Sequence, residues 1–242
     1  MRLDKYISAC GAASRSEVKR LIRAGAVSVN GQAAKAADMK IDENSDIVCL
    51  SGTPLRYRKY VYLMLNKPQG YISATEDRHY KTVTELVPEE YVHFGVFPVG
   101  RLDIDTEGLL ILTNDGQLDH EITSPKKNVY KRYFARLDAP AHPEDTDTFA
   151  AGMEFSDFTA KSARLQITDD PREVYIEIAE GKFHQVKRMC AKVGKNVEFL
   201  KRVAIGALEL DGTLAPGEMR EMSPEEVRLA LKNGEEIGGG TA

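Results

Sequence analysis

Two carboxylates and an arginine lie close together in one short polar stretch of the sequence. Arg101, Asp103 and Asp105 follow the apolar residues 96–99 and precede the apolar run 109–112. A polar loop between two apolar segments predicts a catalytic loop held between two buried strands. Paired carboxylates can carry out general acid and base chemistry, as in a glycoside hydrolase, or they can cap a turn and pair with the arginine. Spacing alone leaves these alternatives open.

A metal site at this pair is disfavoured. No histidine or further carboxylate cluster accompanies the pair at a usable spacing. The three cysteines, Cys10, Cys49 and Cys190, are far apart, odd in number and not in metal spacing, which predicts free thiols in a reducing compartment. No apolar run is long enough to span a bilayer, and the N-terminus resembles no signal peptide. We therefore expect a cytoplasmic protein, with a monomer as the default.

Charge is distributed unevenly along the 242 residues, a length that suits one large domain or two smaller ones. The net charge of −4 argues by itself against a nucleic-acid partner. Residues 1–58, however, contain ten Lys and Arg against six Asp and Glu, a balance of +4, which leaves −8 on the remainder. A basic module on an acidic body indicates that one part of the chain binds a polyanion.

The basic module is predicted to form two helices and a hairpin. Helical spacing indicates helices over residues 2–10 and 15–24, the second begun by a Ser-Arg-Ser-Glu capping box. Residues 27–31 predict a strand and a tight Asn-Gly turn, with a second strand at 46–50. The cations on the helices are a solvated face on one interpretation and phosphate contacts on the other, which the accumulated charge favours. The predicted RNA-binding cations of this module are Arg2, Arg15, Lys19, Arg20 and Arg23.

These features resemble the S4 RNA-binding domain. The resemblance rests on Arg-Leu-Asp-Lys-Tyr at residues 2–6, Ser-Arg at 14–15, the hairpin at 27–31 and Ile47. It implies RNA as a partner but no chemistry of its own. We predict an S4-like domain over residues 1–58, which includes a linker from residue 51, and a catalytic domain over residues 59–242.

The second domain mixes strands with irregularly spaced helices. Residues 60–65, 130–137, 164–167 and 173–179 have strand character, and apolar spacing predicts a helix that ends at Gly194. A regular alternation of strand and helix is missing, which predicts an α+β fold with a mainly antiparallel sheet.

Several motifs of this domain resemble the RsuA-type pseudouridine synthases. The main one is Gly-Arg-Leu-Asp-x-x-Thr-x-Gly-Leu-Leu at residues 100–110, continued by Thr-Asn-Asp at 113–115. The remaining motifs are Asn-Lys-Pro-x-Gly at 66–70, Lys-x-Tyr at 131–133, Glu-Gly-x-x-His-Gln-Val-Lys-Arg-Met at 180–189 and Leu-x-Arg-x-x-Ile-Gly at 200–206. They occur in the family's order, and the resemblance covers most of the chain.

The resemblance implies isomerisation of a uridine in RNA without cofactor or metal. The base detaches from C1′, rotates and reattaches through C5. Asp103 matches the essential carboxylate, whose first step could be attack on the sugar, attack on the base, or proton abstraction from the ribose. Lys187 matches its cationic partner, and Arg101 matches a residue that helps to hold the uridine out of its helix. Tyr133 matches a tyrosine that stacks on the flipped base, and Leu200 would pack the pocket floor.

Four further polar residues in the motifs are predicted to contact RNA. Lys67 could reach a phosphate or only cap its turn, and Arg188 could belong to a solvated helix face. The four residues are Lys67, Gln185, Arg188 and Arg202. We expect His184 to be a structural residue and assign no catalytic role to Asp105.

The motif at residues 180–189 resembles the small-subunit enzymes, because large-subunit relatives more often carry Asn-Arg-Gln-Ile-Arg-Arg there. The predicted substrate is therefore uridine 516 of 16S rRNA, free or in a small-subunit assembly intermediate. The alternatives are a 23S rRNA enzyme of the same family, a non-catalytic RNA-binding assembly factor, and a glycoside hydrolase.

Overall fold

The structure is a computed structural model that describes residues 1–233. The chain forms two compact units, one of residues 1–61 with 88–95 and one of residues 62–87 with the chain from 96 onward. The predicted Gly-rich end at residues 238–240 lies outside the described residues. None of the helices in residues 1–233 has the length and apolar character that crossing a membrane requires.

The first unit packs two helices on a small antiparallel sheet. Its elements are α1 (Leu3–Ala9), α2 (Arg15–Arg23), β1 (Val27–Val29), β2 (Gln32–Ala33), β3 (Val48–Leu50) and β4 (Thr53–Pro54), with strand order β2-β1-β3-β4. Leu3, Ile7, Val18, Val27 and Val48 form its core, and all five are fully buried. One apolar side of each helix therefore packs against the sheet, as the helical spacing predicts.

Local signals set the ends of these elements. Ser14 and Glu17 form the predicted capping box at the start of α2. Asn30 and Gly31 both have positive φ, which suits the two-residue turn that joins β1 to β2. The predicted linker starts too early, because residues 51–54 extend the sheet through a second tight turn and β4.

A segment far along the chain belongs to the first unit. Residues 88–95 contain the short helix α3 (Glu89–Val92). The His93 ring lies so close to Gly11 that a Cβ atom there would be 2.6 Å from its Nδ1. The Arg58 guanidinium lies 5.6 Å from the centre of the Phe94 ring, within the range of a cation–π contact.

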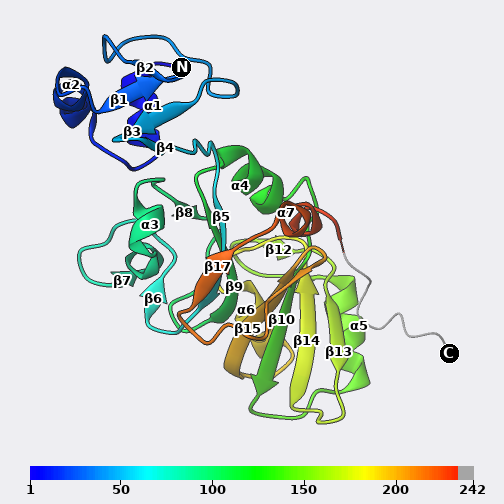
Figure 1. The fold of residues 1–242 in the computed structure, drawn as a ribbon. Coiled ribbons are helices and arrows are strands. Elements are labelled where there is room, and N and C mark those ends of the chain that lie inside the picture. Colours follow the sequence, from blue (N-terminus) through cyan, green and yellow to red (C-terminus); the bar gives the residue numbers. More distant parts are fainter. Residues whose placement is uncertain (234–242) are drawn as a thin grey trace. The chain divides into compact units, whose positions relative to one another are not determined.

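The second unit is a twisted central sheet with helices and short strands around it (Figure 1). Its first elements are β5 (Tyr62–Lys67), β6 (Tyr71–Ile72), β7 (Lys81–Thr82), the 3₁₀ turn η1 (Val83–Leu86), β8 (Phe97–Pro98), β9 (Glu107–Thr113), α4 (Gly116–Thr123), β10 (Lys131–Leu137) and α5 (Pro143–Ala151). The others are β11 (Met153–Glu154), β12 (Thr159–Ala160), β13 (Arg164–Ile167), β14 (Glu173–Ile178), α6 (Gln185–Lys192), β15 (Val197–Ile205), β16 (Leu208–Glu209), β17 (Met219–Glu221) and α7 (Pro224–Ala230).

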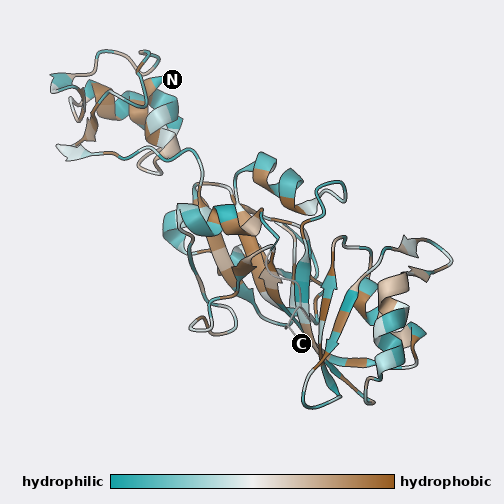
Figure 2. Ribbon diagram, turned by 90° about the vertical axis from the view of Figure 1, so that its right-hand side faces the viewer, coloured by the Kyte–Doolittle hydropathy of each residue, from teal (hydrophilic) through white to brown (hydrophobic). Residues whose placement is uncertain are grey.

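The central sheet runs β13-β14-β10-β15-β9-β5-β17. Within the described residues its pairs are antiparallel except β15 with β9, and the predicted α+β fold with a mainly antiparallel sheet is confirmed. Figure 2 shows apolar residues gathered on the strands and on one side of the helices, with polar residues on the loops. The core therefore lies between the sheet and the helices that cover it.

Strand β9 explains the continuous apolar run of the sequence. It lies between β15 and β5, and its residues 109–112 are fully buried. Leu109 and Ile111 pack with Leu118 and Ile122 of α4 in one apolar cluster. A strand that is buried on both faces shows an apolar run instead of the alternation of a half-exposed strand. The polar loop before it is thus anchored on the best-buried strand of the unit.

Gly108 allows β9 to meet β15. It has φ +104°, and a Cβ atom there would lie 2.2 Å from the carbonyl oxygen of Arg202, its partner in the parallel register. Backbone atoms of a central strand cannot move aside as a flexible side chain can.

We expect Gly108→Ala to lower the free energy of unfolding by about 2–4 kcal/mol, through backbone strain and the clash with β15. Gly116→Ala is the matched control, because a Cβ atom there meets nothing within 4 Å; it should change stability by less than about 1 kcal/mol. Urea denaturation measures both. Equal stabilities for the two variants would contradict the close approach.

Candidate active site

A buried lysine anchors the loop that carries Asp103. Lys67, at the end of β5, is fully buried, and its Nζ donates to the carbonyl oxygens of Pro68 at 3.0 Å, Asp103 at 3.1 Å and Thr106 at 2.9 Å. Burial lowers the pKa of Lys67 to about 8, although the charges of Asp105 and Asp103 favour the protonated form. The prediction that Lys67 contacts RNA is therefore wrong, because its ammonium group is bonded to the loop and inaccessible.

Two further sets of hydrogen bonds fix the same loop. The Ser73 hydroxyl donates to the carbonyl oxygen of Leu102 and accepts from its backbone N–H. The backbone N–H of Gly70 donates to the carbonyl oxygen of Ile104. Three anchoring positions outside the loop thus leave its backbone little freedom, which is what a site for precise chemistry requires.

Lys187 of α6 bridges the two carboxylates of the loop. Its Nζ lies 3.3 Å from Asp103 Oδ2 and 2.5 Å from Asp105 Oδ1. Burial by itself would raise the pKa of Asp105, but the hydrogen bond and charge of Lys187 outweigh it and hold that pKa below its usual value. The predicted pairing of Lys187 with Asp103 is present, and Asp105 is a second partner that the sequence did not indicate.

Buried polar contacts orient the helix that carries Lys187. Gln185 is 3% exposed; its side chain accepts from the backbone N–H of Lys182 and donates to Glu180 at 3.0 Å. Glu180 also accepts from the backbone N–H of Lys161. The prediction that Gln185 contacts RNA is wrong, since both ends of its amide are used to fix the turn before α6.

Arg188 is bound within the protein as well. Its guanidinium forms an ion pair with Asp157 and lies 4.7 Å and 4.6 Å from the ring centres of Phe155 and Phe158. These contacts attach α6 to the hairpin of β11 and β12. The Arg188 side chain stays 28% exposed, and its predicted contact with RNA stays a prediction.

The remaining predicted pocket residues do converge on Asp103. Tyr133 from β10 and Leu200 from β15 line a narrow hollow together with Arg101, Asp103 and Lys187. Tyr133 is 8% exposed and Leu200 4%, whereas Arg101 is exposed. An adjoining hollow of about 290 Å³ is also lined by Arg101 and Tyr133. Tyr133 therefore borders both hollows, and Asp103 borders the narrow one.

Arg202 is buried beside the candidate site. It is 4% exposed, and its Nε donates to the carbonyl oxygen of Leu109 at 2.7 Å. Its side chain connects β15 to β9 and also lines the adjoining hollow. Its predicted contact with RNA stays a prediction.

His184 lies closer to the chemistry than its sequence position indicates. It has a left-handed backbone with φ 51°, and its Nε2 lies 3.7 Å from Asp103 Oδ2. Only the motif around it could have signalled this proximity. Within residues 1–233, no three His, Cys, Asp or Glu side chains gather in a group that could hold a metal ion.

The predicted RNA-binding cations of the first unit lie at its surface. Arg15, Lys19, Arg20 and Arg23 have exposed side chains. Arg2 pairs with Asp4, and its side chain stays 57% exposed. A hollow of about 390 Å³ is lined by Arg2, Lys19, Arg23 and Lys35, together with Ile22 and residues 36–38. Sequence reasoning missed Lys35, because it follows the hairpin and lies outside the helical arc.

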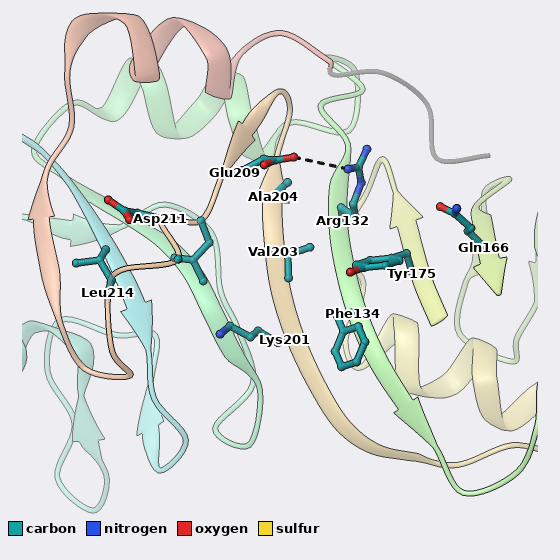
Figure 3. A pocket seen from close by; sticks show the side chains of 12 residues that line it. Arg132, Phe134, Gln166, Tyr175, Lys201, Val203, Ala204, Glu209, Asp211 and Leu214 are labelled. Atoms are coloured by element: carbon teal, nitrogen blue, oxygen red, sulfur yellow. Dashed lines mark ion pairs between the residues drawn. The ribbon is translucent and has the colours of Figure 1, made fainter. Parts of the chain in front are cut away.

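A separate hollow of about 410 Å³ lies on the opposite face of the central sheet. Figure 3 shows Phe134 and Tyr175 on neighbouring strands with Lys201 beside them, and Asp211 and Leu214 across the hollow. Because side chains alternate along a strand, Phe134 faces away from Tyr133. None of the residues near Asp103 lines this hollow.

Known proteins share both units. The family model for RNA pseudouridylate synthase matches residues 61–192, more than half of the chain, and the S4 domain model matches residues 1–47. The uncharacterised RNA pseudouridine synthase YtzG of Bacillus subtilis (strain 168) is 46% identical over 95% of this chain and 98% of its own. Ribosomal small subunit pseudouridine synthase A of Escherichia coli (strain K12) is 41% identical over 94% of this chain and 98% of its own.

The chain belongs to the RsuA-type family of RNA pseudouridine synthases. A crystal structure of a pseudouridylate synthase has the same fold, with a TM-score of 0.67 and 35% identity over 95% of this chain and 99% of that one. This pseudouridine synthase is therefore an enzyme with an S4 domain at its N-terminus, as the sequence motifs predict.

The free energy of unfolding of this pseudouridine synthase should depend on pH in a way that reflects the lowered pKa of Lys67. Its pKa of about 8 in the folded chain compares with 10.5 for an ordinary lysine. Between these pH values the unfolded chain binds the proton that the folded chain has released. The free energy of unfolding of the wild type should therefore rise with pH relative to Lys67→Met, by up to roughly 3 kcal/mol.

Urea denaturation at steps from pH 7 to 10.5 measures this difference. Lys131→Met is a matched variant and should give the same sign, because burial also lowers the pKa of Lys131 to about 8. A difference between wild type and Lys67→Met that stays constant with pH would count against a buried ammonium group.

Proposed function

We propose that this enzyme converts uridine 516 of 16S small-subunit rRNA to pseudouridine, with Asp103 as the essential carboxylate. The observation that carries the proposal is the placement of Asp103 against Lys187, at 3.3 Å, in a hollow walled by Tyr133 and Leu200. The small-subunit target is supported by relatives from Escherichia coli (strain K12) and Yersinia pestis, both named ribosomal small subunit pseudouridine synthase A.

The reaction is an isomerisation that balances without a further reactant. The bond between N1 of uracil and C1′ of the ribose breaks, the base rotates, and a bond forms between C5 and C1′. The hydrogen on C5 leaves as a proton while N1 gains one. No electrons are gained or lost overall, so the protein needs to supply only a carboxylate, a pocket for the base and groups that move protons.

Lys187 places a positive charge beside the essential carboxylate. The Asp103 side chain is 30% exposed, and the ammonium group of Lys187 lies 3.3 Å from it. Asp105 contacts the same ammonium group from its other side. A base that covers the pocket would exclude water and strengthen the attraction between these charges.

Two of the pocket residues contact the flipped base, and a third occupies the position that the base leaves in the RNA. Tyr133 offers a ring face against which uracil can stack, and Leu200 closes the pocket beneath it. Arg101 is exposed at the rim, where it can occupy the position of the flipped uridine in the RNA. Flipping costs a few kcal/mol of lost stacking, least in unpaired RNA, and these contacts offset it.

The first unit supplies affinity for the rRNA. Its S4 domain presents Arg15, Lys19, Arg20 and Arg23 at the surface. Phosphate contacts of this kind position an RNA without reading its sequence. We assign recognition of the rRNA to this surface and to Arg2, and the chemistry to the second unit.

A glycoside hydrolase is disfavoured by the state of the second carboxylate. That reaction needs one carboxylic acid with a raised pKa to protonate the leaving oxygen. The pKa of Asp105 is lowered, because the hydrogen bond and charge of Lys187 outweigh the effect of burial. Asp105 therefore serves as a partner of Lys187 and not as a proton donor.

Asp103→Asn should lower pseudouridine formation at least about 1,000-fold, because the amide can neither carry charge nor act as a nucleophile or base. Asp105→Asn is the matched control and should lower it less than about 10-fold, since that carboxylate is 62% exposed and only assists Lys187. Tritium release from 16S rRNA transcribed with [5-³H]uridine measures both.

Carbodiimide treatment and primer extension on 16S and 23S rRNA, from cells with and without the protein, then locate the modified uridine. Loss of a stop in 16S rRNA supports the small-subunit target, whereas loss only in 23S rRNA overturns it. Equal tritium release by wild type and Asp103→Asn would refute the role of Asp103.

Removing two cations of the first unit should weaken RNA binding and its dependence on salt. For Lys19→Ala with Arg23→Ala, the slope of log affinity against log salt should become shallower by about 1.4–1.8, which is the loss of two phosphate contacts. Lys126→Ala with Lys127→Ala removes the same charge from the second unit and is the control. Identical slopes for the two double variants in filter binding to 16S rRNA would exclude the S4 surface.

A further inference from the structure

Phe183 is an exposed aromatic residue between two residues that line the Asp103 pocket. Its side chain is 72% exposed, the highest value among the exposed large apolar side chains of residues 1–233. The neighbouring residues Lys182 and His184 line the hollow that contains Asp103. Phe183 contributes little to the folded core, because most of its surface stays in water.

Contacts with neighbouring residues fix the position of the Phe183 ring. It stacks on the His184 imidazole, with ring centres 3.8 Å apart and an angle of 18° between the planes. The turn beneath is fixed by the buried side chain of Gln185, which bonds to Lys182 and Glu180. The stacking surface is therefore formed before any ligand arrives, which reduces the entropy lost on binding.

The stacked pair reaches the reactive carboxylate directly. The His184 Nε2 atom lies 3.7 Å from Asp103 Oδ2, and Phe183 stacks on the same imidazole ring. A uridine whose base reaches Asp103 has left its stack, and the adjacent base has lost one stacking partner. An exposed aromatic ring at this distance can replace that partner.

We propose that Phe183, supported by His184, forms a stacking subsite for a nucleobase adjacent to the target uridine in single-stranded RNA. The inference rests on the proposed reaction at Asp103. Stacking on an aromatic side chain tolerates any base, because each has a π face. The subsite therefore holds the strand open beside the flipped uridine and adds no sequence preference of its own.

Substitution of the ring tests the subsite. Phe183→Ala should lower kcat/KM roughly 5- to 100-fold on an RNA fragment that carries the mapped target uridine, mainly through a higher KM. Phe183→Trp and Phe183→Tyr should retain activity, because both keep a flat ring. Tyr80→Ala removes another exposed aromatic side chain, 58% exposed, whose neighbours in the chain line neither hollow near Asp103, and should leave kcat/KM unchanged.

RNA lacking one base separates stacking from a structural role. The fragment is made with an abasic nucleotide immediately 5′ or 3′ of the target. With one of these two RNAs, wild type and Phe183→Ala should react at the same rate, because the partner of the ring is gone. An equal loss of kcat/KM for Phe183→Ala on the intact RNA and on both abasic RNAs would overturn the subsite. Wild-type kcat/KM for Phe183→Ala on the intact RNA would overturn it as well, and would favour a protein as the partner of the ring. Tritium release by the wild type tests the reaction itself, so the two failures are distinct.

Discussion

The ammonium group of Lys67 is the interaction on which the candidate site depends. It is buried at the end of β5 and bonded to three carbonyl oxygens, two of them in the Asp103 loop. A backbone loop beside a sheet must satisfy its carbonyl groups without water, and one lysine does so for three of them. The loop therefore has one low-energy conformation, and Asp103 is presented to the pocket from a rigid base.

The sheet brings the other parts of the site to this loop. Strand β9 begins immediately after it and lies beside β15, where Gly108 and Arg202 are paired in a close parallel approach. Strand β15 contributes Leu200, and its other neighbour, β10, contributes Tyr133. Helix α6 adds Lys187 from a turn locked by Gln185. Buried polar contacts thus fix the Asp103 loop and helix α6, and Lys187 and Asp103 meet at the pocket.

Local patterns predicted much of the first unit, because its signals are short-range. The capping box at Ser14 and the Asn30-Gly31 turn depend on residues next to one another. The attachment of residues 88–95 to that unit was not predictable, since it depends on packing of His93 against Gly11. The same distinction applies to Lys67, Gln185 and Arg202, whose polar character suggested RNA contacts although all three are buried.

The sequence by itself determined the family and the kind of reaction, and it predicted the site residues Asp103, Tyr133, Lys187 and Leu200 as a set, because the motifs and their order are a property of the sequence. Only the tertiary structure decided which charged groups face the pocket and which support it. It gave Lys187 two carboxylate partners, bonded Lys67 to the backbone of the loop and placed His184, on which Phe183 stacks, beside Asp103. The physical reason is that burial and electrostatic partnership depend on residues far apart in sequence, which only the packed sheet brings together.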